Sequence, residues 1–246
     1  MPWRTSTDPY YVLVSELMLQ QTQVDRVIPK FNAFITAFPA IADLARAPLS
    51  DVLQLWSGLG YNRRAKFLHS AAQKVVADFG GVVPNTLEGL VSLPGVGPNT
   101  AGAIMAYSFN DPVSFIETNV RTVYFYHFFQ ESQAVTDAEL RQKVAETTDH
   151  EHPREWYWAM MDYGSWLKKQ GFSANSKSAH YKKQAPLKGS LREMRGLLLK
   201  LLSAGDQPVT ALTEEFGNDS RYEIALAALL QEGLLTQSGD RIHLPH

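Results

Sequence analysis

Cysteine is absent from this chain of 246 residues. That absence excludes disulfides, a thiol nucleophile, a zinc–thiolate site and an iron–sulfur cluster held by cysteine. Long apolar runs are lacking too, since no stretch approaches the roughly 20 residues that a membrane-spanning helix needs. The first residues, MPWRTSTDPY, lack the charged and then apolar pattern of a secretory signal. We therefore expect a soluble, cytoplasmic protein that does not contact a membrane.

Positive charge is scarce overall, because 23 Lys and Arg face 25 Asp and Glu. This balance argues against nucleic acid as a partner, since neutralising phosphates requires Lys and Arg. The distribution points the other way between Gly164 and Lys200, where basic residues face a single acid, Glu193. This basic stripe comprises Lys168, Lys169, Lys177, Lys182, Lys183, Lys188, Arg192, Arg195 and Lys200. The stripe favours a polyanionic partner, and a solvated Lys-rich loop is the alternative.

Strand patterns are nearly absent, and helical periodicity fills most of the chain. Apolar residues recur at spacings of three and four over 10–23, 25–37, 49–55, 63–78, 86–92, 98–108, 119–129, 137–146 and 154–168. The sequence then predicts three more helices, followed by two short strands around a Ser-Gly-Asp turn, over 190–203, 208–216, 220–233 and 234–244. We expect an all-α fold with a winged-helix-like module at 189–246, after a linker near 182–188.

One carboxylate interrupts the most apolar of these helices. In PYYVLVSELMLQQTQV, every residue from Val12 to Leu19 is apolar except Ser15 and Glu16. Such a helix is buried on most of its circumference, and a carboxylate there must be paired, protonated or functional. Burial raises the pKa of a carboxyl group and keeps it a usable acid near neutral pH. Glu16 is therefore a candidate general acid, with a buried structural salt bridge as the alternative.

A Pro-Gly-Val-Gly-Pro segment separates two of the predicted helices, within LPGVGPNTAGAI at 93–104. Gly95 and Gly97 permit positive φ and close approach, so backbone N–H groups and the start of the next helix can face a phosphate. Contacts of this kind hold a nucleic-acid backbone without reading its sequence. A plain tight turn is the alternative.

Several segments together resemble the helix-hairpin-helix DNA glycosylases of the endonuclease III superfamily, and within it the MutY-type adenine glycosylases. They are PWR (2–4), DPYYVLVSELMLQQTQVDRVIPKF (8–31), LWSGLGYNRRAKFLHSAAQKV (55–75), LPGVGPNTAGAI (93–104), ETNVRTV (117–123) and AMMDYG (159–164). The resemblance implies a two-lobed helical fold with DNA in the cleft between the lobes. One lobe would comprise residues 1–18 and 119–185, and the six-helix lobe with its helix-hairpin-helix residues 19–118. The implied protein is a monomer whose partner is double-stranded DNA holding a damaged or mispaired base.

The resemblance also assigns catalytic groups. Glu16 falls on the family's catalytic glutamate, which protonates the extruded purine so that it leaves as a neutral base. Glu117 stands where the family has an aspartate that faces the oxocarbenium charge of the sugar. Its side chain keeps the negative charge on an arm longer by one methylene. Asn119 matches the asparagine that orients the carboxylate or water; alternatively it caps the following helix.

Other positions match the family's base pocket and DNA contacts. Trp3 and Arg4 align with residues that stack on and hydrogen-bond the adenine. Gln21 resembles the wedge that fills the gap left by the flipped base. Tyr61 resembles the aromatic that stacks into the opposite strand, although an aromatic after a Gly turn is more often part of a core. The implied DNA contacts are Gln20, Gln21, Thr22, Tyr61, Gly95, Gly97, Lys168, Lys169, Lys182 and Lys183.

Asn99, which we group with the base pocket, indicates the reaction type. Endonuclease III-type enzymes carry a lysine at this place, form a Schiff base with the sugar and cut the strand. Without that amine, the resemblance implies a monofunctional glycosylase of base excision repair, which hydrolyses the bond, leaves an abasic site and has no lyase activity. Lys168, Asn175, Ser178 and Gln184 stand where the family has its cluster cysteines. We therefore expect no iron–sulfur cluster, no other metal and no cofactor.

The excised base stays open at this point. Mispaired adenine is the first candidate substrate. Mispaired thymine or uracil, or a modified base, is the alternative, because the thymine and uracil mismatch glycosylases of the superfamily also lack the lysine. Residues 190–246 resemble a winged helix instead of the family's module that reads 8-oxoguanine. The helix predicted at 220–233 carries Glu223 and Glu232 beside only Arg221, so we favour a structural or partner-binding role for this module. The other class of function is a catalytically inactive DNA-binding homologue, which the retained catalytic residues disfavour.

Overall fold

The computed structural model describes residues 1–132, 134–172 and 186–245, so Lys182 and Lys183 lie outside the described residues. Helices dominate, with a small sheet near the C-terminus, as the all-α prediction with a winged-helix-like module requires. Every helix in these ranges is too short or too polar to cross a membrane. The 3-10 turn η1 (Pro2–Arg4) precedes α1 (Pro9–Leu19), α2 (Val24–Ala37), α3 (Ile41–Arg46), α4 (Leu49–Trp56), α5 (Arg63–Phe79), α6 (Leu87–Val91), α7 (Pro98–Phe109), α8 (Thr118–His127), α9 (Asp137–Thr147) and α10 (Pro153–Lys169).

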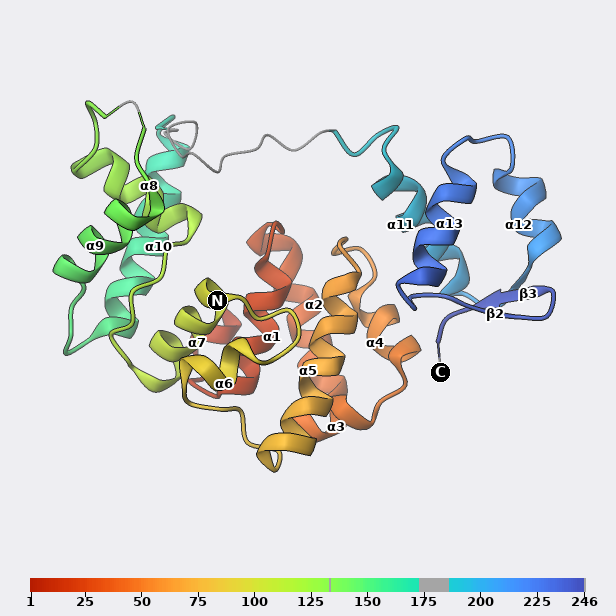
Figure 1. Cartoon of the computed structure of the whole chain (residues 1–246), viewed down its shortest axis with the longest axis horizontal. Helices are drawn as coiled ribbons and strands as arrows, with labels where there is room; N and C mark the ends of the chain where they lie inside the picture. Colours follow the sequence, from red (N-terminus) through yellow and green to blue (C-terminus); the bar gives the residue numbers. More distant parts are fainter. Residues whose placement is uncertain (133, 173–185, 246) are drawn as a thin grey trace.

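Helix α1 lies near the middle of the molecule (Figure 1). Asp8 caps its N-terminus by accepting a hydrogen bond from the backbone N–H of Tyr10 at 2.8 Å. Pro9 occupies the first turn, where a missing N–H costs nothing. Every residue from Val12 to Met18 is buried, and the helix packs against α2, α5 and α7. The prediction of a helix buried on most of its circumference is confirmed.

Helices α8, α9 and α10 form a group beside α7 (Figure 1), in which α10 packs along α8 and also contacts α7. Gly164 permits this approach, because a Cβ there would lie 2.3 Å from the backbone oxygen of Asn119. Tyr157 stacks on Phe115 with ring centroids 4.0 Å apart, and its hydroxyl accepts a hydrogen bond from the Phe115 N–H at 3.1 Å. These contacts hold the segment between α7 and α8 against α10. The residue bounds of the two lobes stay a prediction.

The C-terminal module contains the predicted helices and hairpin, with one strand more than the sequence predicts. Its elements are α11 (Leu191–Leu202), β1 (Gln207–Pro208), α12 (Val209–Phe216), α13 (Tyr222–Gln231), β2 (Thr236–Ser238) and β3 (Arg241–His243). The strand order is β1-β3-β2 with antiparallel pairs, and Ile242 lies opposite both Gln207 and Gln237. The short strand β1 pairs with β3, which is more than 30 residues later in the chain, so no local pattern in the sequence predicts β1.

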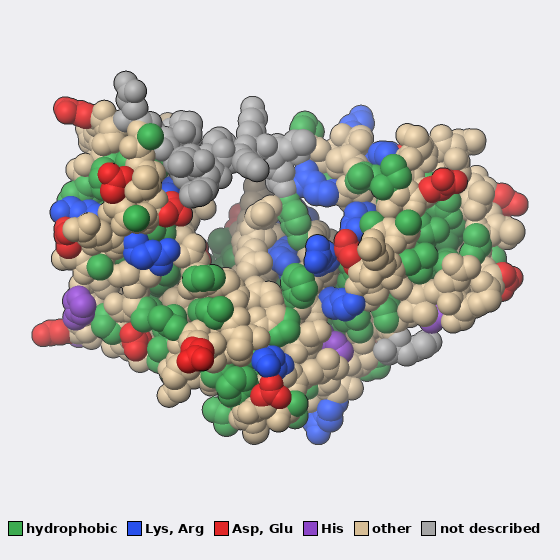
Figure 2. All heavy atoms as spheres, in the orientation of Figure 1, with side chains coloured by type: hydrophobic (Ala, Val, Ile, Leu, Met, Phe, Trp, Pro, Cys, Tyr) green, Lys and Arg blue, Asp and Glu red, His purple; other side chains and the backbone are tan. Residues whose placement is uncertain are grey.

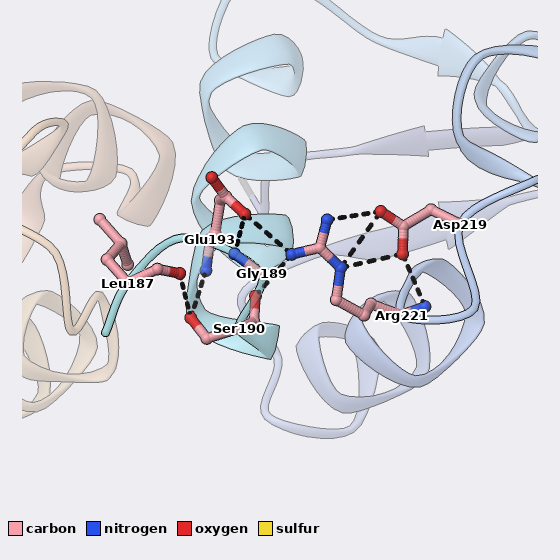
Figure 3. A network of polar contacts seen from close by, with 6 residues as sticks. All are labelled: Leu187, Gly189, Ser190, Glu193, Asp219 and Arg221. Carbon is pink, nitrogen blue, oxygen red and sulfur yellow. Dashed lines mark hydrogen bonds and ion pairs between the residues drawn. The ribbon is translucent and has the colours of Figure 1, made fainter. Parts of the chain in front are cut away.

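An arginine joins the helices of this module (Figure 3). Arg221 binds the Asp219 carboxylate, and its Nη1 donates to Glu193 Oε2 at 2.8 Å and to the Ser190 carbonyl at 3.2 Å. Ser190 in turn caps α11 by accepting from the Glu193 N–H. The start of α11 is therefore fixed to the start of α13.

The module docks on helices α4 and α5 of the preceding part. Lys66 of α5 donates to the backbone carbonyl of Glu232, whose side chain lies 3.8 Å from Arg63. The backbone N–H of Ser50 donates to the carbonyl of Pro245 at 3.0 Å. These polar contacts hold the module against α4 and α5. Arg192 of α11 thereby reaches Tyr61, which lies just before α5.

Candidate active site

A cavity of about 740 Å³ opens between η1, the C-terminal end of α1, the start of α8 and helix α10. Ten side chains predicted from the sequence line it, although they are far apart in the chain. They are Trp3, Arg4, Glu16, Gln20, Gln21, Thr22, Asn99, Glu117, Asn119 and Lys168. Tyr107, Trp158 and Asp162 also line it, and they were not predicted from the sequence. Asp162 belongs to the AMMDYG segment, the one local signal for its presence.

Glu16 is buried in this cavity with only 9% of its surface exposed. Burial raises its pKa well above the usual range, and the negative charge of Glu117 and a hydrogen bond to that carboxyl group raise it further. The guanidinium of Arg4 opposes this shift. Because the charged form is desolvated and faces a second carboxylate, these surroundings favour the protonated form of Glu16.

Glu117 is the residue directly before α8, at its N-cap position. Burial raises the pKa of this carboxyl group too, but the hydrogen bond from Glu16 and the charge of Lys168 lower it. Two interacting carboxyl groups with unlike surroundings share protons unequally. The proton of the pair therefore belongs on Glu16, which donates, and the negative charge on Glu117, which accepts.

Asn119 and Lys168 contact each other in the cavity that the two carboxyl groups line. Lys168 donates from Nζ to Oδ1 of Asn119 at 2.7 Å, and its side chain is half-buried. Burial lowers the pKa of Lys168, and the charge of Glu117 opposes that shift. Lys168 was predicted to face DNA with the rest of the basic stripe, but in the structure its side chain lines the active-site cavity. The next residue, Lys169, is exposed.

The predicted base pocket is braced by contacts that the sequence did not reveal. Arg4 binds the carboxylate of Asp162 through two hydrogen bonds of 2.8 and 2.9 Å, and its guanidinium lies 5.6 Å from the ring centroid of Trp158. Trp3 is buried and packs edge-on against Phe31. These contacts orient Arg4 along the cavity and make Trp3 part of its wall. Their contact with a base stays a prediction.

Asn99 is exposed at the start of α7. Its Oδ1 accepts a hydrogen bond from the backbone N–H of Ile116 at 3.3 Å. Since Ile116 directly precedes Glu117, this contact braces the segment that carries the second carboxyl group. Gln20, at the end of α1, donates to the hydroxyl of Thr100 at 3.4 Å and joins the same region.

The hairpin between α6 and α7 needs glycine at one of its two predicted positions. Gly95 has a φ of 80°, and a Cβ there would lie 2.7 Å from Cβ of Phe67. Gly97 does not use the positive φ that glycine permits, because its φ of −88° lies in the extended region. No atom lies within 4 Å of where its Cβ would be. Gly97 thus leaves the N-terminus of the long helix α7 open to a close approach.

Gln21, the predicted wedge, and Tyr61, the predicted stacking aromatic, share an unusual backbone conformation. Gln21 and Tyr61 have φ of 55° and 48°, in the left-handed region that residues with side chains rarely adopt. Such strain persists where the surrounding structure holds it, and it concentrates at functional sites. Arg64 supplies part of that support, because its guanidinium donates to the carbonyls of Leu17, at 2.6 Å, and of Gly60, at 3.0 Å.

A second cavity of about 480 Å³ lies beside Gln21 and Tyr61. Its lining residues are Gln20, Gln21, Gly60, Tyr61, Asn62, Arg63, Arg64, Phe67, Arg192, Arg195, Gly196 and Glu232. Gln20 and Gln21 line both cavities, which therefore adjoin at the wedge. Lys and Arg side chains gather in the hollow between the C-terminal module and α5 (Figure 2). Arg192 of α11 donates to the hydroxyl of Tyr61 at 2.6 Å.

The helix of the C-terminal module that lies beside Tyr61 is α11, and not the helix predicted at 220–233. Helix α11 lines the second cavity with the basic residues Arg192 and Arg195, and the acidic Glu232, directly after α13, lines it as well. Arg195 is paired with Glu232 at 2.6 Å. Of the basic-stripe residues that the structure describes, Lys168 therefore lines the first cavity, and Arg192 and Arg195 line the second.

Residues 14–149 match the HhH-GPD superfamily of base excision DNA repair proteins. The chain belongs to this superfamily. The match includes Glu16, Glu117, Asn119 and the hairpin, and it ends before α10 with Lys168 and before the C-terminal module. The helix-hairpin-helix glycosylase fold expected from the sequence is confirmed for this HhH-GPD chain.

Curated relatives of this HhH-GPD protein bear the name adenine DNA glycosylase. One from Buchnera aphidicola subsp. Baizongia pistaciae is 36% identical over 166 residues, which cover 67% of this chain and 47% of the relative. One from Mycolicibacterium smegmatis is 30% identical, covering 98% of this chain and 89% of the relative. The chain thus spans about half the length of the first of these relatives.

The fold resembles solved glycosylase structures. That of a thermostable thymine-DNA glycosylase superposes with a TM-score of 0.59 and 24% identity, covering 67% of this chain and 77% of the other. At this identity the likeness concerns the fold alone.

Proposed function

We propose that this protein is a monofunctional DNA glycosylase that hydrolyses the N-glycosidic bond of mispaired adenine in double-stranded DNA. The observation that carries this proposal is a pair of carboxyl groups, the buried Glu16 and the half-buried Glu117, which share a hydrogen bond beside Asn119 in one cavity. The name shared by the curated relatives supports adenine as the base. The protein would act as a cytoplasmic monomer in base excision repair.

The proton on Glu16 supplies the acid step. When the flipped adenine enters the cavity, Glu16 transfers its proton to a ring nitrogen. The C1′–N bond then breaks with its electron pair going to the base, which leaves neutral. The raised pKa of Glu16 keeps this proton available near neutral pH.

The negative charge on Glu117 supplies the second step. Positive charge develops at C1′ as the base leaves, and a preorganised carboxylate beside it stabilises that charge. Water then adds to C1′ and gives its proton to a carboxylate of the pair, which leaves an abasic site. Asn119 donates from its amide to Glu117 or to this water.

The absence of strand cutting follows from the side chain at position 99. An amide cannot form a Schiff base with the sugar, and Asn99 is engaged with the backbone of Ile116. Lys168 is held as a hydrogen-bond donor to Asn119, and we assign it the protonated form. No amine in this arrangement acts as a nucleophile, so the reaction ends at the abasic site.

Three features would hold the DNA. The open N-terminus of α7 after Gly97 faces a phosphate. Gln21 and Tyr61 occupy the space of the extruded base and stack into the opposite strand. Arg192 and the neighbouring arginines of the second cavity approach the same strand with positive charge.

A panel of duplexes tests the proposal. Single-turnover reactions with excess enzyme would use adenine opposite guanine, cytosine or 8-oxoguanine, and thymine or uracil opposite guanine. Alkali then converts abasic sites to strand breaks, and omission of alkali detects lyase activity. We expect alkali-dependent breaks at mispaired adenine. Release of thymine or uracil alone would show that the substrate is a mispaired pyrimidine rather than adenine. No base release from any duplex would refute the proposal that the protein is an enzyme.

A further inference from the structure

Lys168 occupies a place in the site that its sequence neighbourhood does not suggest. Its amine donates to Oδ1 of Asn119 at 2.7 Å, and its side chain lines the cavity that contains Glu16 and Glu117. A lysine in a basic stripe would be expected to point to solvent or to phosphate. Lys169, the next residue, does so.

Backbone packing explains why Lys168 reaches this place. Gly164 lies four residues earlier on α10, and residues four apart share one face of a helix. The Gly164 face presses on the backbone of Asn119, since a Cβ there would lie 2.3 Å from its oxygen. Lys168, one turn further on the same face, is thereby placed over the Asn119 side chain.

The contact decides how the amide of Asn119 is oriented. An amide has a donor end and an acceptor end, and Lys168 can only donate. Oδ1 therefore faces Lys168, and the NH₂ group faces the remaining part of the cavity, where Glu117 and a water nucleophile would lie. The charge of Lys168 also acts on Glu117.

We propose that Lys168 is a positioning residue of the glycosylase reaction, which fixes the Asn119 amide with its NH₂ toward the cavity and supplies the cation that holds Glu117 as an anion beside protonated Glu16. This inference rests on the proposed function and extends it to α10, outside the matched superfamily region. Lys168 touches Asn119 rather than the reacting atoms, so it acts through its neighbours.

The charged and titratable groups around the pair define what a pH experiment would report. The groups that interact with Glu16, Glu117 or their neighbours are Arg4 of η1, Tyr107 of α7 and Lys168 of α10. Arg4 is partly neutralised by its pairing with Asp162. Lys168 is therefore the cation whose removal most directly changes Glu117.

The test compares Lys168→Gln with Lys168→Arg and with Lys169→Gln. Base release is measured in single turnover at saturating enzyme over a range of pH, and duplex affinity is measured separately. Lys168→Gln should slow base release by about 100-fold, the lower end of the loss when an electrostatic group at a reacting centre is removed. Duplex affinity should change by no more than about threefold, because this charge faces the cavity.

The pH profile separates positioning from simple damage. Without the cation, Glu117 ionises at higher pH, so the acidic limb of the rate profile should move to higher pH in Lys168→Gln. Lys168→Arg keeps a cation that can donate, and should recover most of the rate with the limb close to that of wild type. Lys169→Gln removes the same charge from the exposed neighbour and should weaken duplex binding without moving the limb.

Three results would overturn the inference. One is a Lys168→Gln protein that matches wild type in rate and pH limb. Another is a Lys168→Gln defect that lies entirely in duplex affinity, like that of Lys169→Gln. The third is a borohydride-trapped DNA complex in wild type that Lys168→Gln abolishes, since this would make Lys168 a nucleophile. If Lys168→Gln fails to fold, a Lys168→Arg protein with a displaced limb overturns it as well. Wild type without any base release would instead refute the proposed function.

Discussion

Replacing Glu16 by Gln tests the central chemistry most directly. Gln has nearly the same shape, and its amide can donate to the Glu117 carboxylate as the protonated acid does. It cannot transfer a proton to the base. The substitution therefore separates proton delivery from the architecture of the cavity.

The expected loss of rate follows from the burial of Glu16. A general acid contributes about 10²- to 10⁴-fold to a rate, which corresponds to roughly 3 to 5 kcal/mol. With only 9% of Glu16 exposed, solvent has poor access to replace the missing acid, so we expect the upper half of that range. Affinity for a mismatched duplex should stay within about threefold of wild type, because the hydrogen bond to Glu117 is kept.

The same substitution should change how stability depends on pH. The pKa of Glu16 is raised above 4.5 in the folded protein, so the folded state binds more protons than the unfolded state above that pH. Wild type therefore loses free energy of unfolding as the pH rises, by about 1.4 kcal/mol for each unit of pKa elevation that is traversed. Glu16→Gln removes this loss, and the variant should gain stability relative to wild type between pH 5 and pH 8.

Two measurements check these expectations. Single-turnover release of adenine gives the rate, and chemical denaturation at pH 5 and pH 8 gives the two stability differences. An active Glu16→Gln protein would refute the assignment of this carboxyl group as the acid. A stability difference that stays the same at both pH values would contradict the raised pKa.

Four further predictions concern neighbouring features. Glu117→Gln should reduce base release nearly as much as loss of the acid, whereas Glu117→Asp keeps the anion and should retain much of the rate; equal single-turnover rates for both would contradict the role of the charge. Asn99→Lys places an amine at the start of α7, and borohydride should then trap a covalent DNA complex that wild type does not give. Gly164→Ala drives a Cβ into the Asn119 backbone, so it should lower the thermal midpoint and the rate together, and an unchanged rate would show that this packing does not place Asn119. Charge reversal at Lys169 or Arg192 should weaken duplex binding and reduce its salt dependence by roughly one unit of slope for each lost phosphate contact, and an unchanged slope would show that the side chain does not face DNA.

Features whose signals lie within a few residues can be predicted from the sequence alone. Asp8 and Pro9 mark the start of α1, and the apolar run behind them requires that it be buried, so Glu16 had to be buried with it. The three helices and the hairpin of the C-terminal module also follow from local periodicity and turn residues. Local signals suffice here because capping, turn geometry and the alternation of apolar and polar residues act over one or two helical turns.

The directions of the charged side chains in the described part of the basic stripe depend instead on how the helices pack. Lys168 and Lys169 are adjacent in the chain, yet one lines the active-site cavity and the other is exposed. The difference arises from the packing of α10 on Asn119 at Gly164, which no local pattern specifies. Arg192 likewise meets Tyr61 only because the C-terminal module docks on α5. Side-chain direction at these positions depends on contacts between residues far apart in the chain, and such contacts exist only once the helices have packed.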